Sequence, residues 1–324
     1  MNARENYLIA ARGGKPQWVP VFFNDSNTFV APHIFADPET GKDIYGVSWS
    51  FADVVGAMPD LLNPIMSDIS QWRTLVSFPD LDAEDWKGMA EAFFATADPD
   101  KVNVAMVNTY GPFLVPIHML GWEEGMLAIY DNPTELFAFM SAITDFICAN
   151  TDHVAEYIKP EIYSLGDDIA GSNGPFISFE VWRELYRPLY QRIIDKIHGY
   201  GALAEFHCCG NNMWLIDELI DMGIDIWQLP MPNADLLERK QRFGSRLVIT
   251  GGWDRFSPAG RIGASEQEVR ASARLAVDNY GSEGGLIFWD GSIFNAPNDP
   301  NAQERMGWLY DEIDRYSREL YAKK

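Results

Sequence analysis

The sequence is short of cysteine and of basic residues, and each shortage excludes a class of protein. Only 3 of the 324 residues are cysteines, and two of them are adjacent, so no disulfide framework is available. The chain has 25 Lys and Arg against 47 Asp and Glu, a formal net charge of −22. Nucleic acids and anionic membrane surfaces both attract clustered positive charge. We therefore expect no nucleic-acid partner and no membrane partner.

Long apolar runs and nucleotide-binding loops are also missing. Residues 1–12 carry mixed charges without the apolar stretch of a signal peptide, and nowhere do about 18 apolar residues run together. We therefore expect a cytoplasmic protein. No G-x-G-x-x-G or G-x-x-x-x-G-K-[ST] sequence follows an apolar strand, which argues against a nucleotide-binding open sheet.

The chain does have apolar strands that alternate with amphipathic helices. The predicted strands are residues 18–23, 102–108, 161–165, 203–208, 224–229, 246–250 and 285–289, and the predicted helices are 179–200, 213–222, 234–243, 265–279 and about 300–321. Such alternation implies a parallel sheet, and about eight strand–helix units in this length favour a (β/α)₈ TIM barrel. We expect one domain over residues 1–324. Residues from about 30 to 100 are irregular and rich in Pro, Asp and Trp, and we expect this elaborated N-terminal segment to cover one mouth of the barrel.

The predicted strand at residues 203–208 carries the strongest chemical signal. Side chains of a strand alternate between its faces, so Glu205, His207 and Cys209 project together to one side, while Phe206 and Cys208 project to the other. A carboxylate, an imidazole and a thiolate make a three-ligand zinc site that leaves a fourth position open. An open position is the arrangement of a catalytic metal rather than a structural one.

Polar and aromatic residues also gather where the predicted strands end, which is where TIM barrels keep their reacting groups. Taken singly, each Asp or Asn there is more often a turn or cap residue. We predict substrate-binding roles for Asn24 and for three aromatic residues that suit a planar substrate, and hydrogen-bonding or proton-donating roles for two carboxylates. These aromatic residues are Tyr110, Trp253 and Trp289, the carboxylates are Asp168 and Asp254, and Gln228 and Asp290 end neighbouring strands.

These motifs resemble those of the uroporphyrinogen decarboxylase-like superfamily, and within it the corrinoid-dependent methyltransferases. The matching pieces are the H-x-C-G of residues 207–210, GDDIAG at 166–171 with PFIS at 175–178 and WREL at 182–185, and TGGWD at 250–254. The resemblance implies a TIM barrel in which His207 and Cys209 bind catalytic zinc.

Two departures from the superfamily narrow the expected activity. The decarboxylases carry arginines near the first strand to hold substrate carboxylates, whereas residues 19–25 contain no basic residue. The thiol-methylating members place a second zinc-binding Cys after the last strand, where this chain has Ser292. The third ligand is then expected to be Glu205, with Asp290 as the alternative. A site with fewer thiolates is a harder Lewis acid, better matched to an oxygen ligand.

The resemblance therefore implies an O-demethylase type of methyltransferase. It would move a methyl group from a methoxylated substrate, an aryl methyl ether, to the Co(I) corrinoid of a partner protein. The sequence contains no cobalamin-binding D-x-H-x-x-G, so the corrinoid (cobalamin) is expected on a separate chain. The alternatives are methyl transfer from a methylcorrinoid to a thiol, and a non-catalytic barrel that binds a tetrapyrrole or corrinoid. Porphyrinogen decarboxylation is a more distant third.

Overall fold

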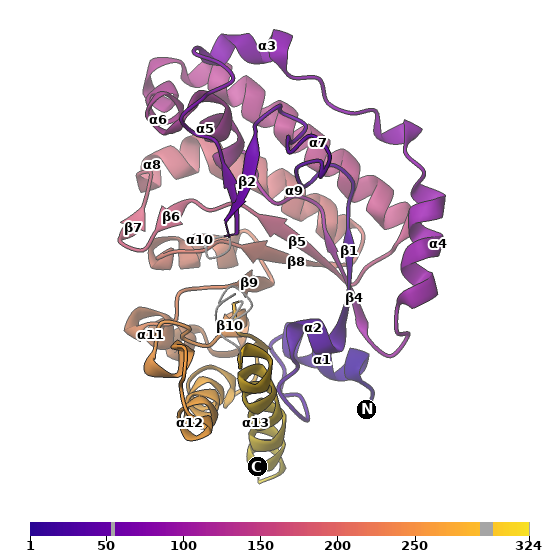
Figure 1. The fold of residues 1–324 in the computed structure, drawn as a ribbon, viewed down its shortest axis with the longest axis vertical. Helices are drawn as coiled ribbons and strands as arrows, with labels where there is room; N and C mark the ends of the chain where they lie inside the picture. Colours follow the sequence, from indigo (N-terminus) through magenta and orange to yellow (C-terminus); the bar gives the residue numbers. More distant parts are fainter. Residues whose placement is uncertain (53–55, 292–300, 324) are drawn as a thin grey trace.

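A curled parallel sheet forms the centre of the molecule in a computed structural model that describes residues 1–52, 56–291 and 301–323 (Figure 1). Its strand order, β1-β4-β5-β8-β9-β10-β11, follows the chain, and each strand is parallel to its neighbours. The strands are β1 (Ser26–Val30), β4 (Val102–Met106), β5 (Ile162–Gly166), β8 (Leu203–His207), β9 (Ile226–Gln228), β10 (Val248–Gly252) and β11 (Leu286–Trp289). This sequential order is the order of an α/β barrel and agrees with the predicted fold.

The prediction of a strand over residues 18–23 is wrong. Val21 makes a single parallel bridge to Phe288, whose N–H donates to the carbonyl of Pro20 at 2.7 Å. The short helix α2 (Phe22–Asp25) then begins, because the Asp25 carboxylate accepts the Val21 N–H at 2.7 Å. Pro20 has no N–H to give to a second strand. A bridge and a helical turn therefore occupy the eighth position between β11 and β1.

Helices cover the outside of the sheet, and the predicted ones are present with local interruptions. The predicted helix 234–243 is α11 (Ala234–Phe243), whereas 179–200 is broken by a π-helical turn at Trp182–Tyr186, and 265–279 passes into another at Val277–Gly281. The predicted helices other than α11 correspond to α8 (Phe179–Val181), α9 (Arg187–Gly199), α10 (Ile216–Asp221), α12 (Glu266–Ala276) and α13 (Ala302–Ala322). The remaining α-helices of the described ranges, apart from α2, are α1 (Ala3–Ala11), α3 (Trp72–Leu75), α4 (Trp86–Thr96), α5 (Leu114–Leu120), α6 (Trp122–Asp131) and α7 (Pro133–Tyr157). Within the described ranges, no helix has the length and apolar character needed to cross a membrane.

The segment from about residue 30 to 100 has more regular structure than expected. It contains an antiparallel hairpin, β2 (Trp49–Ala52) with β3 (Gly56–Pro59), as well as the 11-residue helix α4. A second small hairpin, β6 (Ala170–Gly171) with β7 (Gly174–Pro175), follows β5. The Trp49 ring stacks on Tyr110, which follows β4, at a centroid distance of 4.9 Å. The β2–β3 hairpin therefore lies against the carboxyl end of the sheet.

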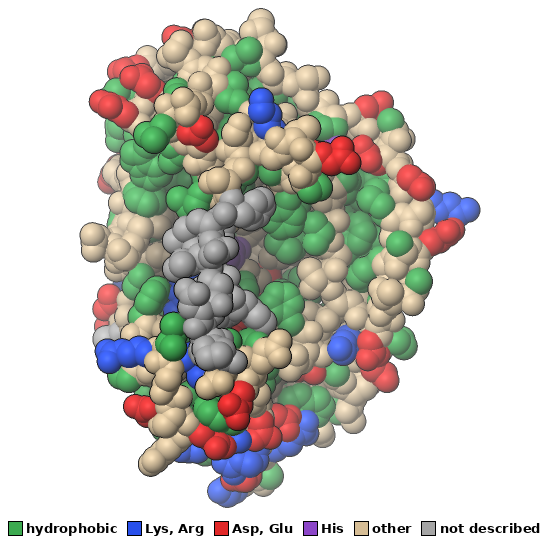
Figure 2. All heavy atoms as spheres, viewed as in Figure 1, with side chains coloured by type: hydrophobic (Ala, Val, Ile, Leu, Met, Phe, Trp, Pro, Cys, Tyr) green, Lys and Arg blue, Asp and Glu red, His purple; other side chains and the backbone are tan. Residues whose placement is uncertain are grey.

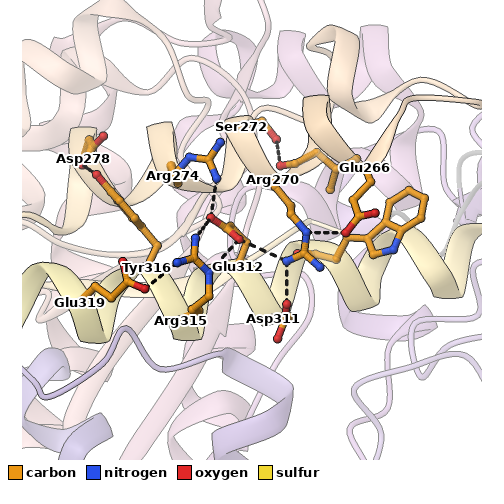
Figure 3. A network of polar contacts seen from close by, with 12 residues as sticks. Glu266, Arg270, Ser272, Arg274, Asp278, Asp311, Glu312, Arg315, Tyr316 and Glu319 are labelled. Atoms are coloured by element: carbon orange, nitrogen blue, oxygen red, sulfur yellow. Dashed lines mark hydrogen bonds and ion pairs between the residues drawn. The ribbon is translucent and has the colours of Figure 1, made fainter.

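The outer helices α12 and α13 are joined by an ion network around one buried carboxylate (Figure 3). Glu312 on α13 is only 1% exposed and accepts hydrogen bonds from Arg274 and Arg315 at 2.5 Å and from Arg270 at 3.2 Å. Figure 2 shows Lys, Arg, Asp and Glu side chains gathered at the end of the molecule where these two helices lie. Burial by itself would raise the pKa of Glu312, but the arginines outweigh it and lower the pKa.

We predict that Glu312→Gln lowers the free energy of unfolding by about 2 kcal/mol. Removing one partner of a fully buried pair costs about 3–5 kcal/mol, and these arginines are partly exposed. Because the folded pKa of Glu312 is lowered, its stabilisation is complete above its unfolded pKa of about 4.3 and is lost as the pH falls through the folded value. Urea unfolding at neutral and acidic pH measures both effects.

Glu319→Gln is the matched control, because Glu319 lies on the same helix, is half exposed and pairs with Arg315. It should cost less than about 1 kcal/mol. Equal losses in the two variants would mean that burial of Glu312 contributes nothing to the stability of this helix pair.

Candidate active site

The register of three neighbouring strands brings polar side chains into one row at the carboxyl end of the sheet. His207 on β8 is paired with Gln228 on β9, and Gln228 is paired with Thr250 on β10. Glu205 lies two residues before His207 and therefore shares its face of β8. Glu205, Gln228 and Thr250 are all buried, at 1%, 5% and 0% exposure.

Hydrogen bonds within this row fix the tautomer of His207. Thr250 Oγ1 donates to one oxygen of Glu205 at 2.7 Å, and the Gln228 amide nitrogen donates to the other at 2.6 Å. The Gln228 amide oxygen is thereby turned to His207 Nδ1, at 2.7 Å, and an amide oxygen can only accept. The proton of a neutral His207 therefore sits on Nδ1. Nε2 keeps its lone pair free for a metal.

The free nitrogen of His207 faces two other potential ligands. Cys209 Sγ lies 3.5 Å from His207 Nε2, and Asp168 accepts the Cys209 backbone N–H at 2.7 Å. One ligand atom from each of Asp168, His207 and Cys209 falls within 4.8 Å of the other two. In a zinc tetrahedron with Zn–N of about 2.0 Å and Zn–S of about 2.3 Å, nitrogen and sulfur are about 3.5 Å apart. The spacing of these atoms fits zinc.

The electrostatics around Cys209 also fit a cation. Burial and the Asp168 charge raise the pKa of the Cys209 thiol to about 12, and Arg255 opposes the rise. A thiol in this setting stays protonated unless a positive charge stands beside it. A metal ion provides that charge and deprotonates a coordinating thiol.

The structure brings together only part of the predicted ligand set. His207 and Cys209 are adjacent as expected, but Glu205 stands behind His207 and reaches it through Gln228. Its two oxygens are engaged by Gln228 and Thr250, so it lies outside the group of potential ligands. Asp168, for which we predicted a role toward substrate, supplies the third potential ligand atom of the group.

A cavity of about 120 Å³ opens beside Cys209 at the ends of β9, β10 and β11. Trp253, Asp254 and Asp290, all predicted site residues, lie on its wall. Trp253 is 4% exposed and donates its indole N–H to Ser272 at 2.9 Å, whereas Asp254 is exposed and accepts the backbone N–H of Phe256.

Asp290 and Leu229 both contribute to the wall of this cavity. Asp290, the alternative ligand, is fully buried and contacts Tyr310. Ser292 lies outside the described residues. Leu229 turns the chain away from β9 at a φ of +55°, and its side chain joins the wall of the cavity.

A second cavity, which is larger at about 220 Å³, lies between the N-terminal segment and the loop after β4. Tyr110 lines it together with Trp49 and His118, which were not predicted. Asn24 and Trp289 lie elsewhere. Asn24 is exposed on α2, and Trp289 stacks on the neighbouring Phe22 at 5.5 Å.

Comparison with known proteins identifies the family of this chain. The model of the family described as uroporphyrinogen decarboxylase (URO-D) matches residues 31–292, which is most of the chain. The chain belongs to the uroporphyrinogen decarboxylase family. The family predicted from the H-x-C-G and its companion motifs is therefore confirmed.

Relatives within and around the URO-D family have more than one activity. The chain is 25% identical over 312 residues to a uroporphyrinogen decarboxylase of Cupriavidus pinatubonensis, covering 89% of this chain and 78% of that protein. It is 29% identical over 143 residues to a methylated-thiol–coenzyme M methyltransferase of Methanosarcina mazei, covering 44% of this chain and 37% of that one. A solved methyltransferase from Methanosarcina mazei superposes with a TM-score of 0.68 over 98% of this chain and 99% of its own, at 14% identity. That likeness confirms the barrel fold.

We predict that Gln228→Leu lowers the affinity of this URO-D family protein for zinc about 10- to 100-fold. The substitution removes the acceptor for His207 Nδ1, so the imidazole loses its fixed tautomer and orientation. Competition for zinc with a chromophoric chelator measures the affinity.

Gln191→Leu on α9 is the control, because Gln191 bonds only Asp195 and the Met222 carbonyl in the described part of the chain. It should leave zinc affinity unchanged. Unaltered affinity in Gln228→Leu would refute the tautomer argument.

Proposed function

We propose that this chain, acting as a single barrel domain, is a zinc-dependent methyltransferase. It moves a methyl group from a methoxylated substrate, an aryl methyl ether, to the Co(I) corrinoid of a partner protein. The observation that carries the proposal is the three-residue group Asp168, His207 and Cys209, with the His207 nitrogen presented by a buried row of hydrogen bonds. The methyltransferases among its relatives support the reaction class.

The donor set supports an oxygen-bearing substrate. One imidazole, one thiolate and one carboxylate would hold zinc with less sulfur than a two-thiolate site, which would make the zinc a harder Lewis acid. Zinc bound there would polarise the ether oxygen and stabilise negative charge that develops on it. The methyl–oxygen bond would break as the partner's corrinoid accepts the methyl group, and the electron pair of that bond would stay on the departing phenolate. Cobalt supplies the nucleophile, so this protein needs to bind, orient and activate the ether.

The protein's own side chains supply the remaining steps. Gln228 and Glu205 hold His207 in the tautomer that leaves Nε2 free, and Trp253 gives an apolar wall beside Cys209. Asp254 lies exposed on the rim of the same cavity, and its carboxylate would pass a proton from water to the leaving phenolate.

Two other activities of relatives fit less well. The methylated-thiol methyltransferase relative favours a thiol substrate, and the single cysteine of the ligand group argues for a harder one. Porphyrinogen decarboxylation requires cations for several carboxylates. Among described residues, Arg255 is the one Lys or Arg that lines either cavity.

Purified protein should contain about one zinc per chain by elemental analysis, and His207→Ala combined with Cys209→Ala should remove it. Cys148→Ala is the control, because this thiol is buried within α7 and belongs to no ligand group in the described ranges. Asp168→Asn should lower zinc affinity more than Glu205→Gln does. The reverse order would return the third ligand role to Glu205.

Methyl transfer should be measurable with methoxyphenol as donor and free cob(I)alamin in place of the partner's corrinoid. The spectrum of methylcobalamin reports the product, and the His207, Cys209 double variant should lose activity at least about 100-fold. Methylation of a thiol by methylcobalamin, with no reaction of the ether, would favour the thiol alternative.

A further inference from the structure

The aromatic cavity that Tyr110 lines has a wall of packed rings, and none of these rings belongs to the group formed by Asp168, His207 and Cys209. Trp49 and Tyr110 stack at 4.9 Å with an interplanar angle of 18°. His118 stands edge-on to both rings, with centroid distances of 5.2 Å and 4.8 Å. Three rings from the N-terminal segment, the β4 loop and α5 therefore meet on one side of the cavity.

Size and composition suit a ring-shaped ligand. An apolar cavity of about 150 Å³ is large enough to bind benzene, and this one measures about 220 Å³. Val107, Val115, Phe146 and Ile147 give it apolar sides. Thr109 also lines the cavity, and its Oγ1 is buried without a hydrogen-bond partner among the described residues.

The loop after β4, which carries Tyr110, contacts the end of β5 and Asp167, the neighbour of Asp168. The loop that carries Tyr110 is tied to the end of β5, because Asn108 donates its amide N–H to the Gly166 carbonyl at 2.7 Å. Burial, Asp168 and Asp43 raise the pKa of Tyr110 to about 12, and Cys209 adds to the rise. Tyr110 therefore lines the aromatic cavity and is also influenced by the charges of Asp168 and Cys209.

Charge selects among possible ring ligands. No Lys or Arg occurs among the described residues that line this cavity. Burial lowers the pKa of His118 to about 4, so this imidazole is neutral at pH 7, and His33 is paired with Glu84 at 2.8 Å. Asp43 adds a carboxylate, anchored by the indole N–H of Trp49 at 2.9 Å. A ligand carboxylate would enter without a cation to pair with and against negative charge.

We propose that this cavity binds the ring of an uncharged methoxyarene, such as a methoxyphenol, and discriminates against methoxybenzoates. The inference rests on the proposed function for the methoxy group, which must reach the ligand group beyond Tyr110. The choice of a neutral over an anionic ring is independent of catalysis, because binding alone tests it.

The test is isothermal titration calorimetry of the full chain with ortho-methoxyphenol and ortho-methoxybenzoate, of which the first is neutral and the second anionic at pH 7. Titrations use zinc-loaded and zinc-stripped protein, so that a contact between carboxylate and metal is separated from the cavity. We expect methoxyphenol to bind at least about tenfold more tightly in both forms. Equal or tighter binding of methoxybenzoate to the stripped protein overturns the proposal.

Trp49→Leu locates the site, because it removes one ring of the wall. It should weaken methoxyphenol binding about tenfold. Trp122→Leu is the matched control, since Trp122 is 40% exposed on α6 and does not line the cavity. Circular dichroism verifies that both variants fold, and unchanged affinity in folded Trp49→Leu overturns the assignment.

The outcomes separate this inference from the proposed function. Selective methoxyphenol binding without methyl transfer supports the cavity and contradicts the methyltransferase. Methyl transfer from methoxybenzoate in preference to methoxyphenol supports the methyltransferase and overturns the cavity's charge selection. Absence of binding by either compound also overturns the inference, whatever the zinc content.

Discussion

The chemistry of this molecule depends on one buried carboxylate, Glu205, and on the amide that it orients. The oxygens of a carboxyl group with 1% exposure must have hydrogen-bond partners, and Thr250 and Gln228 supply them. The amide of Gln228 has two different ends, so fixing its nitrogen on Glu205 fixes its oxygen on His207. The tautomer of an imidazole at the mouth is thus determined by a residue deeper in the barrel. Three adjacent strands must keep their register for this to hold.

Much of the fold and part of the site could be predicted from the sequence, for reasons visible in particular residues. Strand periodicity put Glu205 and His207 on one face, and that is correct. The same periodicity could not predict which of the two side chains could bind a metal, because it indicates the face of the strand and not how deeply a side chain is buried. Asp168 reaches the ligand group from the loop after β5, and its contact with Cys209 arises from two strands that are adjacent only in the folded sheet.

The errors occur where local hydrogen bonding overrides an apolar pattern. Residues 18–23 read as a strand, yet the Asp25 carboxylate takes the Val21 N–H and starts a helix. The aromatic cavity was also not predictable, because Trp49 and His118 are 69 residues apart and belong to a hairpin and a helix. Only the folded chain brings these rings to Tyr110. The contact between these rings brings the N-terminal segment against the loop that carries Tyr110.

The backbone of Leu229 is strained in the folded state. A residue with a Cβ in the left-handed region is less stable by roughly 1–2 kcal/mol, a strain that glycine escapes. Glycine there would leave the cavity beside Cys209 without the hydrocarbon that Leu229 contributes to its wall. The leucine side chain adds apolar surface to the cavity that Cys209 also lines, and apolar surface has a lower dielectric than water. A charge on this thiolate, or on a substrate atom next to it, is therefore felt more strongly than it would be in an open groove.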